Sequence, residues 1–250
     1  MYEKMKVDII GQGNVGSHLA KALQSTADVA VVNPRSLESL RPDSDFYIIS
    51  VSDSAISDVF GRLISMLPPE ATGIIAHTSG STDISALSQQ RLRFGVFYPL
   101  QTFSKDVALE YDKIPVLIDG CNEETSEKLE SLAALFSSKV RRAGSTERRK
   151  LHLASVFACN FANRLWSIAD EYLSEENLDF ELLKPLIAET CRKMMVTRHP
   201  AEGQTGPAVR RDLPTIDKHL DMLSSRPAFR QIYSIMTDSI MATPDVDHFK

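Results

Sequence analysis

The sequence predicts an α/β protein, in which a doubly wound, mostly parallel sheet is followed by an all-helical C-terminal domain. Two observations support this prediction. Short apolar runs rich in β-branched and aromatic residues alternate with helical periodicity, at 5–10, 29–32, 46–51, 73–77, 94–98, 115–118 and 139–142. Beyond Gly144 only helical periodicity remains, at 147–173, 181–196, 215–223 and 228–243. We therefore expect one domain over residues 1–144 and a second over residues 145–250, with an unpacked tail from Pro244 onward.

The first strand-like run leads directly into a glycine turn and then into a helix. Residues 11–16 read G-Q-G-N-V-G. In this spacing the first glycine permits a tight turn, the second lets the backbone approach a pyrophosphate, and the third lets the helix pack close to the strand. The N-terminal amides of the helix then point at the bound anion. The first domain is therefore predicted to bind a dinucleotide through Gly11, Gly13, Asn14, Val15 and Gly16, with an ordinary structural loop as the alternative.

The end of the second strand-like run indicates which dinucleotide is bound. An acidic residue at this position usually accepts hydrogen bonds from the ribose 2′-hydroxyl of NAD. This chain instead has Asn33, Pro34, Arg35 and Ser36, which offer a guanidinium and hydrogen-bond donors and no carboxylate to repel a 2′-phosphate. NADP is therefore predicted as the cofactor, with contacts from Asn33, Arg35 and Ser36. In the alternative interpretation, Pro34 only turns the chain and Arg35 is a solvated surface charge.

Polar side chains follow the next three strand-like runs. Ligands of doubly wound sheets lie outside the carboxyl ends of the strands, so we expect these side chains to surround a nicotinamide and a small polar substrate. The predicted cofactor contacts are Val51, Ser52 and Ser79, the predicted substrate contacts are Tyr98 and Gln101, and His77 is a candidate proton donor. Each of these residues taken alone is equally explained as a turn or cap residue.

Polar residues also form a stripe on the helix expected over 147–173, made of His152, Ser155, Cys159, Asn160 and Asn163. The stripe either faces a cleft between the domains, where His152 and Asn160 are catalytic candidates, or forms satisfied hydrogen bonds at a subunit interface. The basic residues 141–142 and 148–150 are expected to form a solvated face, with anion binding as the alternative. In segment 205–212 a glycine-proline turn precedes two arginines, so Arg210 is predicted to hold a substrate carboxylate or phosphate. The alternative there is an interhelical turn in which Asp212 caps the next helix and pairs with an arginine.

The composition restricts the partners of the chain. A formal net charge of −5 over 250 residues argues against nucleic acid, because neutralising phosphates requires a basic face. Three widely spaced cysteines fit a reducing compartment, and no apolar run approaches the roughly 18 residues that span a membrane, so we expect a cytoplasmic protein. The six histidines lack ligand-type spacing, so no metal is predicted. Apolar residues surround the long helix, which predicts its burial in a homodimer.

A family resemblance becomes visible in these motifs, which are 11–16, 33–36, 51–53, 77–81, 98–103, His152 with Asn160, and 205–207 with Arg210 and Asp212. The chain resembles an uncharacterised bacterial family that joins a Rossmann-like domain to a helical domain of unknown function. It is more distantly similar to pyrroline-5-carboxylate reductase, to the F420-dependent NADP oxidoreductases and to the 6-phosphogluconate dehydrogenase superfamily. The resemblance implies a dinucleotide-binding Rossmann-like domain over 1–144, NADP(H) as cofactor, and dimerisation through a helical domain over 145–250.

The chain departs from the hydroxyacid branch of that superfamily, which uses a K-x-x-x-N pair on its long helix. Asn160 is present, but Val156 stands at the lysine position. An apolar side chain cannot protonate a hydroxyl or polarise a carbonyl, so that mechanism does not carry over, and His152 is the candidate substitute.

Two functional hypotheses follow. The first is a reductase that passes a hydride from NADPH to a small carbonyl or imine substrate, with His77 or His152 as the acid. The second is a non-catalytic module that senses NADP(H). A donor within reach of a substrate atom over the nicotinamide favours the first, and an open or plugged nicotinamide position favours the second.

Overall fold

The computed structural model describes residues 4–88 and 92–243, so the tail expected to be unpacked from Pro244 lies outside the described part. The chain divides into two compact units, Met1–Asn160 and Phe161–Lys250. The first helix of the expected C-terminal domain therefore groups with the sheet. The functions predicted for the domains over residues 1–144 and 145–250 stay predictions.

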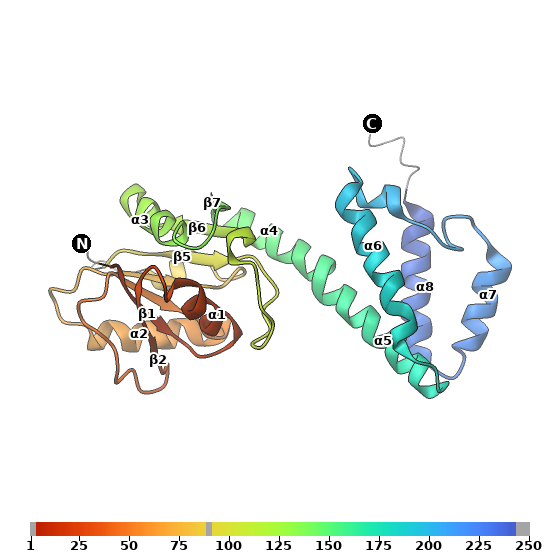
Figure 1. Ribbon diagram of the computed structural model, residues 1–250, viewed down its shortest axis with the longest axis horizontal. Helices are drawn as coiled ribbons and strands as arrows, with labels where there is room; N and C mark the ends of the chain where they lie inside the picture. Colours follow the sequence, from red (N-terminus) through yellow and green to blue (C-terminus); the bar gives the residue numbers. More distant parts are fainter. Residues whose placement is uncertain (1–3, 89–91, 244–250) are drawn as a thin grey trace. The chain divides into compact units, whose positions relative to one another are not determined.

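The first unit is built on a sheet that has seven strands in the described residues (Figure 1). The strands are β1 (Lys6–Ile10), β2 (Asp28–Val32), β3 (Phe46–Ile49), β4 (Ile74–His77), β5 (Phe94–Pro99), β6 (Val116–Gly120) and β7 (Val140–Arg142). Their order is β2-β1-β3-β4-β5-β6-β7, and every pair is parallel except β5 with β6. The predicted doubly wound, mostly parallel sheet is thereby confirmed.

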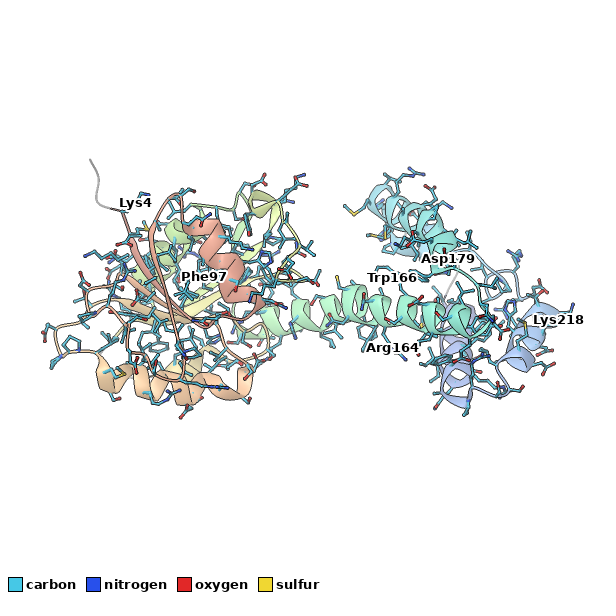
Figure 2. All side chains as sticks on the ribbon, turned by 60° about the horizontal axis from the view of Figure 1, so that its bottom comes forward. Lys4, Phe97, Arg164, Trp166, Asp179 and Lys218 are labelled. Atoms are coloured by element: carbon cyan, nitrogen blue, oxygen red, sulfur yellow. The ribbon has the colours of Figure 1, made fainter. Side chains whose placement is uncertain are left out.

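Helices cover both faces of this sheet. Helices α1 (Asn14–Leu23) and α3 (Glu123–Ala133) pack on one face, in a core that includes Leu19, Leu129 and the fully buried Phe97. Figure 2 labels Phe97 within the sheet unit. Helix α2 (Ile56–Met66) covers the other face with Val59 and Leu63. Strand β1 has β2 as its neighbour on one side and β3 on the other, so the strand order reverses between β1 and β3. Sheets of this kind bind ligands at such a switch point, outside the carboxyl ends of the two strands.

The expected long helix over 147–173 is not one regular helix. The structure has α4 (Ser145–Ser155), a π-helix (Val156–Phe161) and α5 (Ala162–Glu175). Single π-helical turns inside α-helices are frequent at functional sites. The basic run is also not uniformly solvated, because the Arg148 side chain is 0% exposed.

The second unit is helical, as predicted, with α5 followed by α6 (Lys184–Val196), α7 (Leu213–Met222) and α8 (Pro227–Ala242). Pro185 and Pro214 stand in the first turns of α6 and α7, where a missing N–H costs no hydrogen bond. In the described part of this unit, residues 161–243, only Ala208, Ile216 and Thr237 are buried. Trp166, labelled in Figure 2, is 38% exposed on α5.

Candidate functional site

The glycine turn joins β1 to α1 with different steric demands at its three glycines. Gly11 has φ of +136°, and a Cβ there would lie 2.0 Å from the Ser50 carbonyl oxygen. At Gly16 a Cβ would lie 2.3 Å from the Gly11 carbonyl oxygen. At Gly13, the N-cap residue of α1, a Cβ would meet nothing within 4 Å. Close packing therefore requires Gly11 and Gly16, whereas Gly13 faces open space at a helix N-terminus, which fits a bound pyrophosphate.

A cavity of about 470 Å³ opens from this turn along the carboxyl ends of the strands. The predicted site residues that line it are Gly11, Gly13, Asn14, Val15, Val51, Ser52, Ser79, Tyr98 and His152. Asp53, Thr78 and Gly80 also line it. The structure thus brings the glycine turn, the ends of β2, β3, β4 and β5, and helix α4 around one space within the first unit.

Tyr98 on β5 and His152 on α4 form a hydrogen-bonded pair in this cavity. The Tyr98 hydroxyl lies 3.1 Å from His152 Nδ1. A Cβ at Gly80 would lie 2.6 Å from the Tyr98 ring and 2.9 Å from His152 Nδ1, so the pair depends on a glycine at that position. Burial raises the pKa of Tyr98, so its hydroxyl stays protonated at neutral pH and can donate to Nδ1. In the tautomer that accepts at Nδ1, His152 carries its hydrogen on Nε2.

Hydroxyl groups of the loop after β4 shape the same end of the cavity. Ser79 Oγ accepts from the Thr82 amide at 2.9 Å and from the Ser81 amide at 3.2 Å. Ser81 Oγ donates to the Asp53 carboxylate. The Ser79 hydroxyl therefore holds the loop, and Ser81 of the loop holds the acidic side chain of Asp53, which comes from the segment after β3, at the cavity wall. Asp53 was not among the predicted site residues, because an Asp after a strand is commonly a turn residue.

His77 lies beneath this loop and does not line the cavity. Its side chain is fully buried, and Nδ1 accepts from the Ser79 amide at 3.1 Å. Its pKa is lowered to about 4, chiefly because burial disfavours the imidazolium and also because the Arg148 charge repels it. A neutral imidazole that fixes the Ser79 backbone is the arrangement that the structure shows.

Arg148 connects the loop to helix α4, and sequence analysis did not single it out. Its Nη1 donates to Asp119 Oδ2 at 3.1 Å and to the Ala143 carbonyl at 3.2 Å. Its Nη2 donates to the Thr82 carbonyl at 2.9 Å. These bonds tie the start of α4 to β6 and to the loop beside Gly80, so Arg148 positions both walls around the Tyr98–His152 pair. A basic run in a sequence gives no sign of which member is buried.

The turn after β2 carries the residues predicted to choose the cofactor. Asn33 Oδ1 accepts from the Arg35 amide at 2.9 Å, an arrangement that fixes the turn. Asn33, Arg35 and Ser36 are exposed and lie outside the lining of the cavity. Within residues 4–88 and 92–243, the Arg35 guanidinium has no hydrogen-bond or ion-pair partner, so it is free for an anion.

A second loop, 101–110, is held against α1. Asn14 Nδ2 donates to the Phe103 carbonyl at 3.0 Å. The buried His18 bridges the Tyr111 hydroxyl at 3.0 Å and the Ser104 carbonyl at 2.9 Å. The Gln101 side chain is exposed and accepts from the Thr102 amide, so Gln101 does not line the cavity.

The remaining predicted residues lie elsewhere. Asn160 is exposed in the π-helix and outside the cavity lining. Arg210 is exposed in the second unit. There Asp212 caps α7, accepting from the Thr215 hydroxyl at 2.8 Å, as the interhelical-turn alternative predicted. Among the residues that the structure describes, no group of three or more His, Cys, Asp or Glu side chains is placed to hold a metal ion.

Comparison with known proteins identifies the family. Residues 114–240 match the model of the domain of unknown function DUF2520, and the chain belongs to this family. A solved structure from Bacteroides fragilis, provisionally named an NADP oxidoreductase, is 34% identical, with a TM-score of 0.88 over 96% of this chain and 99% of that one. No curated protein matches the sequence.

Two other solved structures share the fold alone. A protein from Thermotoga maritima is 17% identical, with a TM-score of 0.70 over 94% of this chain and 96% of that one. A reductive aminase from Aspergillus terreus, solved with NADPH and ethyl levulinate, is 16% identical, with a TM-score of 0.56 over 87% of this chain and 78% of that one. The Rossmann-like architecture predicted from the sequence is therefore confirmed, while the specific kinship with pyrroline-5-carboxylate reductase stays a prediction. No helix in the described part of the chain is long and apolar enough to cross a membrane.

Proposed function

We propose that this protein is an NADP(H)-dependent oxidoreductase that reduces a small carbonyl or imine substrate. The observation that carries the proposal is that the glycine turn and the Tyr98–His152 pair line the same cavity. A dinucleotide on the turn and a proton donor would then share one space, as hydride transfer to a polar double bond requires. The name of the Bacteroides fragilis relative and the NADPH held by the Aspergillus terreus enzyme support the same cofactor.

In this proposal NADPH supplies the hydride when it is bound, and the chain supplies binding and a proton. The open face of Gly13 and the amides of α1 hold the pyrophosphate, and Arg35 pairs with the 2′-phosphate. His152 gives the Nε2 proton to the substrate oxygen or nitrogen as it gains the hydride, while Nδ1 takes the Tyr98 hydroxyl proton, which solvent then replaces, so the ring stays a neutral imidazole. Tyr98 donates to Nδ1 and so holds the ring in the tautomer that this transfer needs. His77 is not assigned the donor role, because it is buried and neutral.

The His152→Ala substitution tests the proposed chemistry. NADPH oxidation is measured against a panel of small keto acids, aldehydes and cyclic imines, and dinucleotide affinity is measured separately by calorimetry. We expect turnover to fall by about a hundredfold or more, as for a positioned acid, with NADPH affinity nearly unchanged. Tyr98→Phe, which keeps the ring and removes the donor to Nδ1, should give a smaller loss. Unchanged turnover in His152→Ala would contradict the role of His152. If the wild-type protein binds NADPH tightly but reduces none of the probes, the result favours the non-catalytic module that senses NADP(H).

We also propose that the second unit forms a homodimer. Its large apolar side chains are unusually accessible, with Leu182 at 73%, Leu186 at 63%, Met195 at 76% and Val196 at 71% exposure. Large contiguous apolar surface is characteristic of an interface, and a second copy of the chain is the partner that is always present. We also propose a cytoplasmic location, because all three cysteines are free, as is usual in a reducing compartment.

A further inference from the structure

Next to the turn that carries Arg35 stands a second arginine, Arg62 on α2, which nothing in the sequence pattern singled out. Arg62 Nη1 donates to the Arg35 carbonyl at 2.9 Å. This contact joins helix α2 to the residue that is expected to meet the 2′-phosphate.

Helix α2 and the turn form one structural piece. Leu37 closes the turn with φ of 57°, and its amide donates to the Asn33 carbonyl at 2.9 Å. The Leu37 side chain is 1% exposed and packs in the same core cluster as Val59 and Leu63 of α2. Leu37 therefore anchors the turn from inside, and Arg62 holds it from outside. The Arg62 guanidinium has little freedom to leave the turn.

Charge and hydrogen-bond capacity at Arg62 are left over for a ligand. Asp58, one helical turn earlier, accepts from Arg62 Nε at 3.2 Å and pairs with Nη2 at 3.0 Å. The Asp58 side chain is 72% exposed, so water screens this pair and it neutralises the guanidinium only weakly. A guanidinium has five N–H groups, and the three contacts with the Arg35 carbonyl and the Asp58 carboxylate leave others available.

We propose that Arg62 is a second specificity-determining residue for the 2′-phosphate of NADP(H), acting together with Arg35. The inference rests on the proposed cofactor and adds the residue that completes its phosphate site. Arg35 approaches from the tip of the turn and Arg62 from the side of α2, and a phosphate with two negative charges accepts bonds from both. NADH lacks this phosphate, so it gains nothing from Arg62.

The test compares ligands that differ only in the 2′-phosphate. Calorimetric dissociation constants are measured for NADPH, NADH, 2′,5′-ADP and 5′-AMP with the full chain, as wild type, Arg62→Ala, Arg62→Lys and Arg35→Ala/Arg62→Ala. In Arg62→Ala we expect the dissociation constants of NADPH and 2′,5′-ADP to rise about tenfold, and those of NADH and 5′-AMP to stay within about twofold. Arg62→Lys, which keeps the charge but loses the fork, should lie between. Losses in the double variant should depart from additivity, because both side chains meet one group.

Lys128→Ala is the matched control, because Lys128 also forms an exposed i,i+4 ion pair, with Glu124 on α3, away from the turn. It should change none of the four constants. Equal weakening of the ligands with and without the 2′-phosphate in Arg62→Ala would reduce Arg62 to a holder of the turn and overturn the inference. No weakening at all would overturn it as well. Wild-type protein that binds neither dinucleotide would instead refute the proposed function itself, and the inference with it.

Discussion

Two histidines near the same cavity have opposite environments. His152 lines the cavity and meets a hydroxyl, whereas His77 is enclosed beneath the loop after β4 and accepts a backbone hydrogen bond. Burial and the neighbouring Arg148 charge keep His77 neutral, since its pKa falls to about 4. Substitution of His152 should therefore change turnover, whereas substitution of His77 should change folding stability.

His77 makes folding stability depend on pH. Its folded pKa of about 4 lies below the ordinary value of 6.5, so between these values the unfolded chain binds more protons and stability falls as the pH falls. The full difference is about 3 kcal/mol in the free energy of unfolding. In His77→Asn, whose amide oxygen can still accept from the Ser79 N–H, this part of the loss between pH 6.5 and 4 should disappear. Urea denaturation at a series of pH values measures it, and parallel curves for the two proteins would contradict the assignment.

The sequence indicates residues whose geometry is set by their neighbours in the chain, and it does not indicate residues whose partners lie across the fold. The glycine turn and Asn33 with Arg35 act through local backbone geometry, so their spacing was informative. Arg148 and Arg62 bond to groups 66 and 27 residues away, respectively, and no local pattern reports such partners. His77 was overestimated for the same reason, because burial by distant segments is invisible in a strand-end motif.

Among the elements, helices α1 and α4 begin in the same way. Both helices have a glycine at the N-cap with extended backbone, Gly13 and Gly144, and a Cβ at either would meet nothing within 4 Å. Ala fits both positions sterically, so each substitution should change the free energy of unfolding by no more than about 1 kcal/mol.

Only Gly13→Ala should then affect the cofactor. Its methyl group would occupy the space where the backbone approaches the pyrophosphate, so we expect NADPH affinity to fall by about tenfold or more. Calorimetry with NADPH measures this effect, and Gly144→Ala provides the control with the same backbone change. NADPH affinity that survives in Gly13→Ala, or that is lost equally in Gly144→Ala, would argue against pyrophosphate binding at this turn.

The elements themselves were largely predictable because each combines apolar periodicity with turn residues. The strands and the helices of the second unit fall close to the expected ranges. The antiparallel pairing of β6 with β5 follows from the connection between them, whose only helical turn in the structure is Tyr111–Lys113, too short for the crossover helix that parallel strands need. The π-helix at Val156–Phe161 had no sequence signal, because its apolar residues also suit an α-helix.

At the scale of the whole molecule, the proposed homodimer has a measurable consequence. The exposed apolar side chains of the second unit require a partner, so light scattering at micromolar concentration should give the mass of two chains. Leu182→Glu combined with Leu186→Glu should shift the mass toward one chain, because it places charges in the apolar surface. Val107→Glu, at an apolar side chain 56% exposed in the first unit, should leave the dimer intact. A monomeric wild-type protein would contradict the proposal.

Binding of NADP(H) by the cavity of the first unit should be visible as a cofactor preference. Calorimetric titration of the wild-type protein with NADPH and with NADH should show NADPH binding at least about tenfold tighter, the value of a charge-assisted contact to the 2′-phosphate. Arg35→Ala should remove most of that preference by weakening NADPH alone. Equal affinity for the two dinucleotides, or no binding of NADPH, would contradict the account.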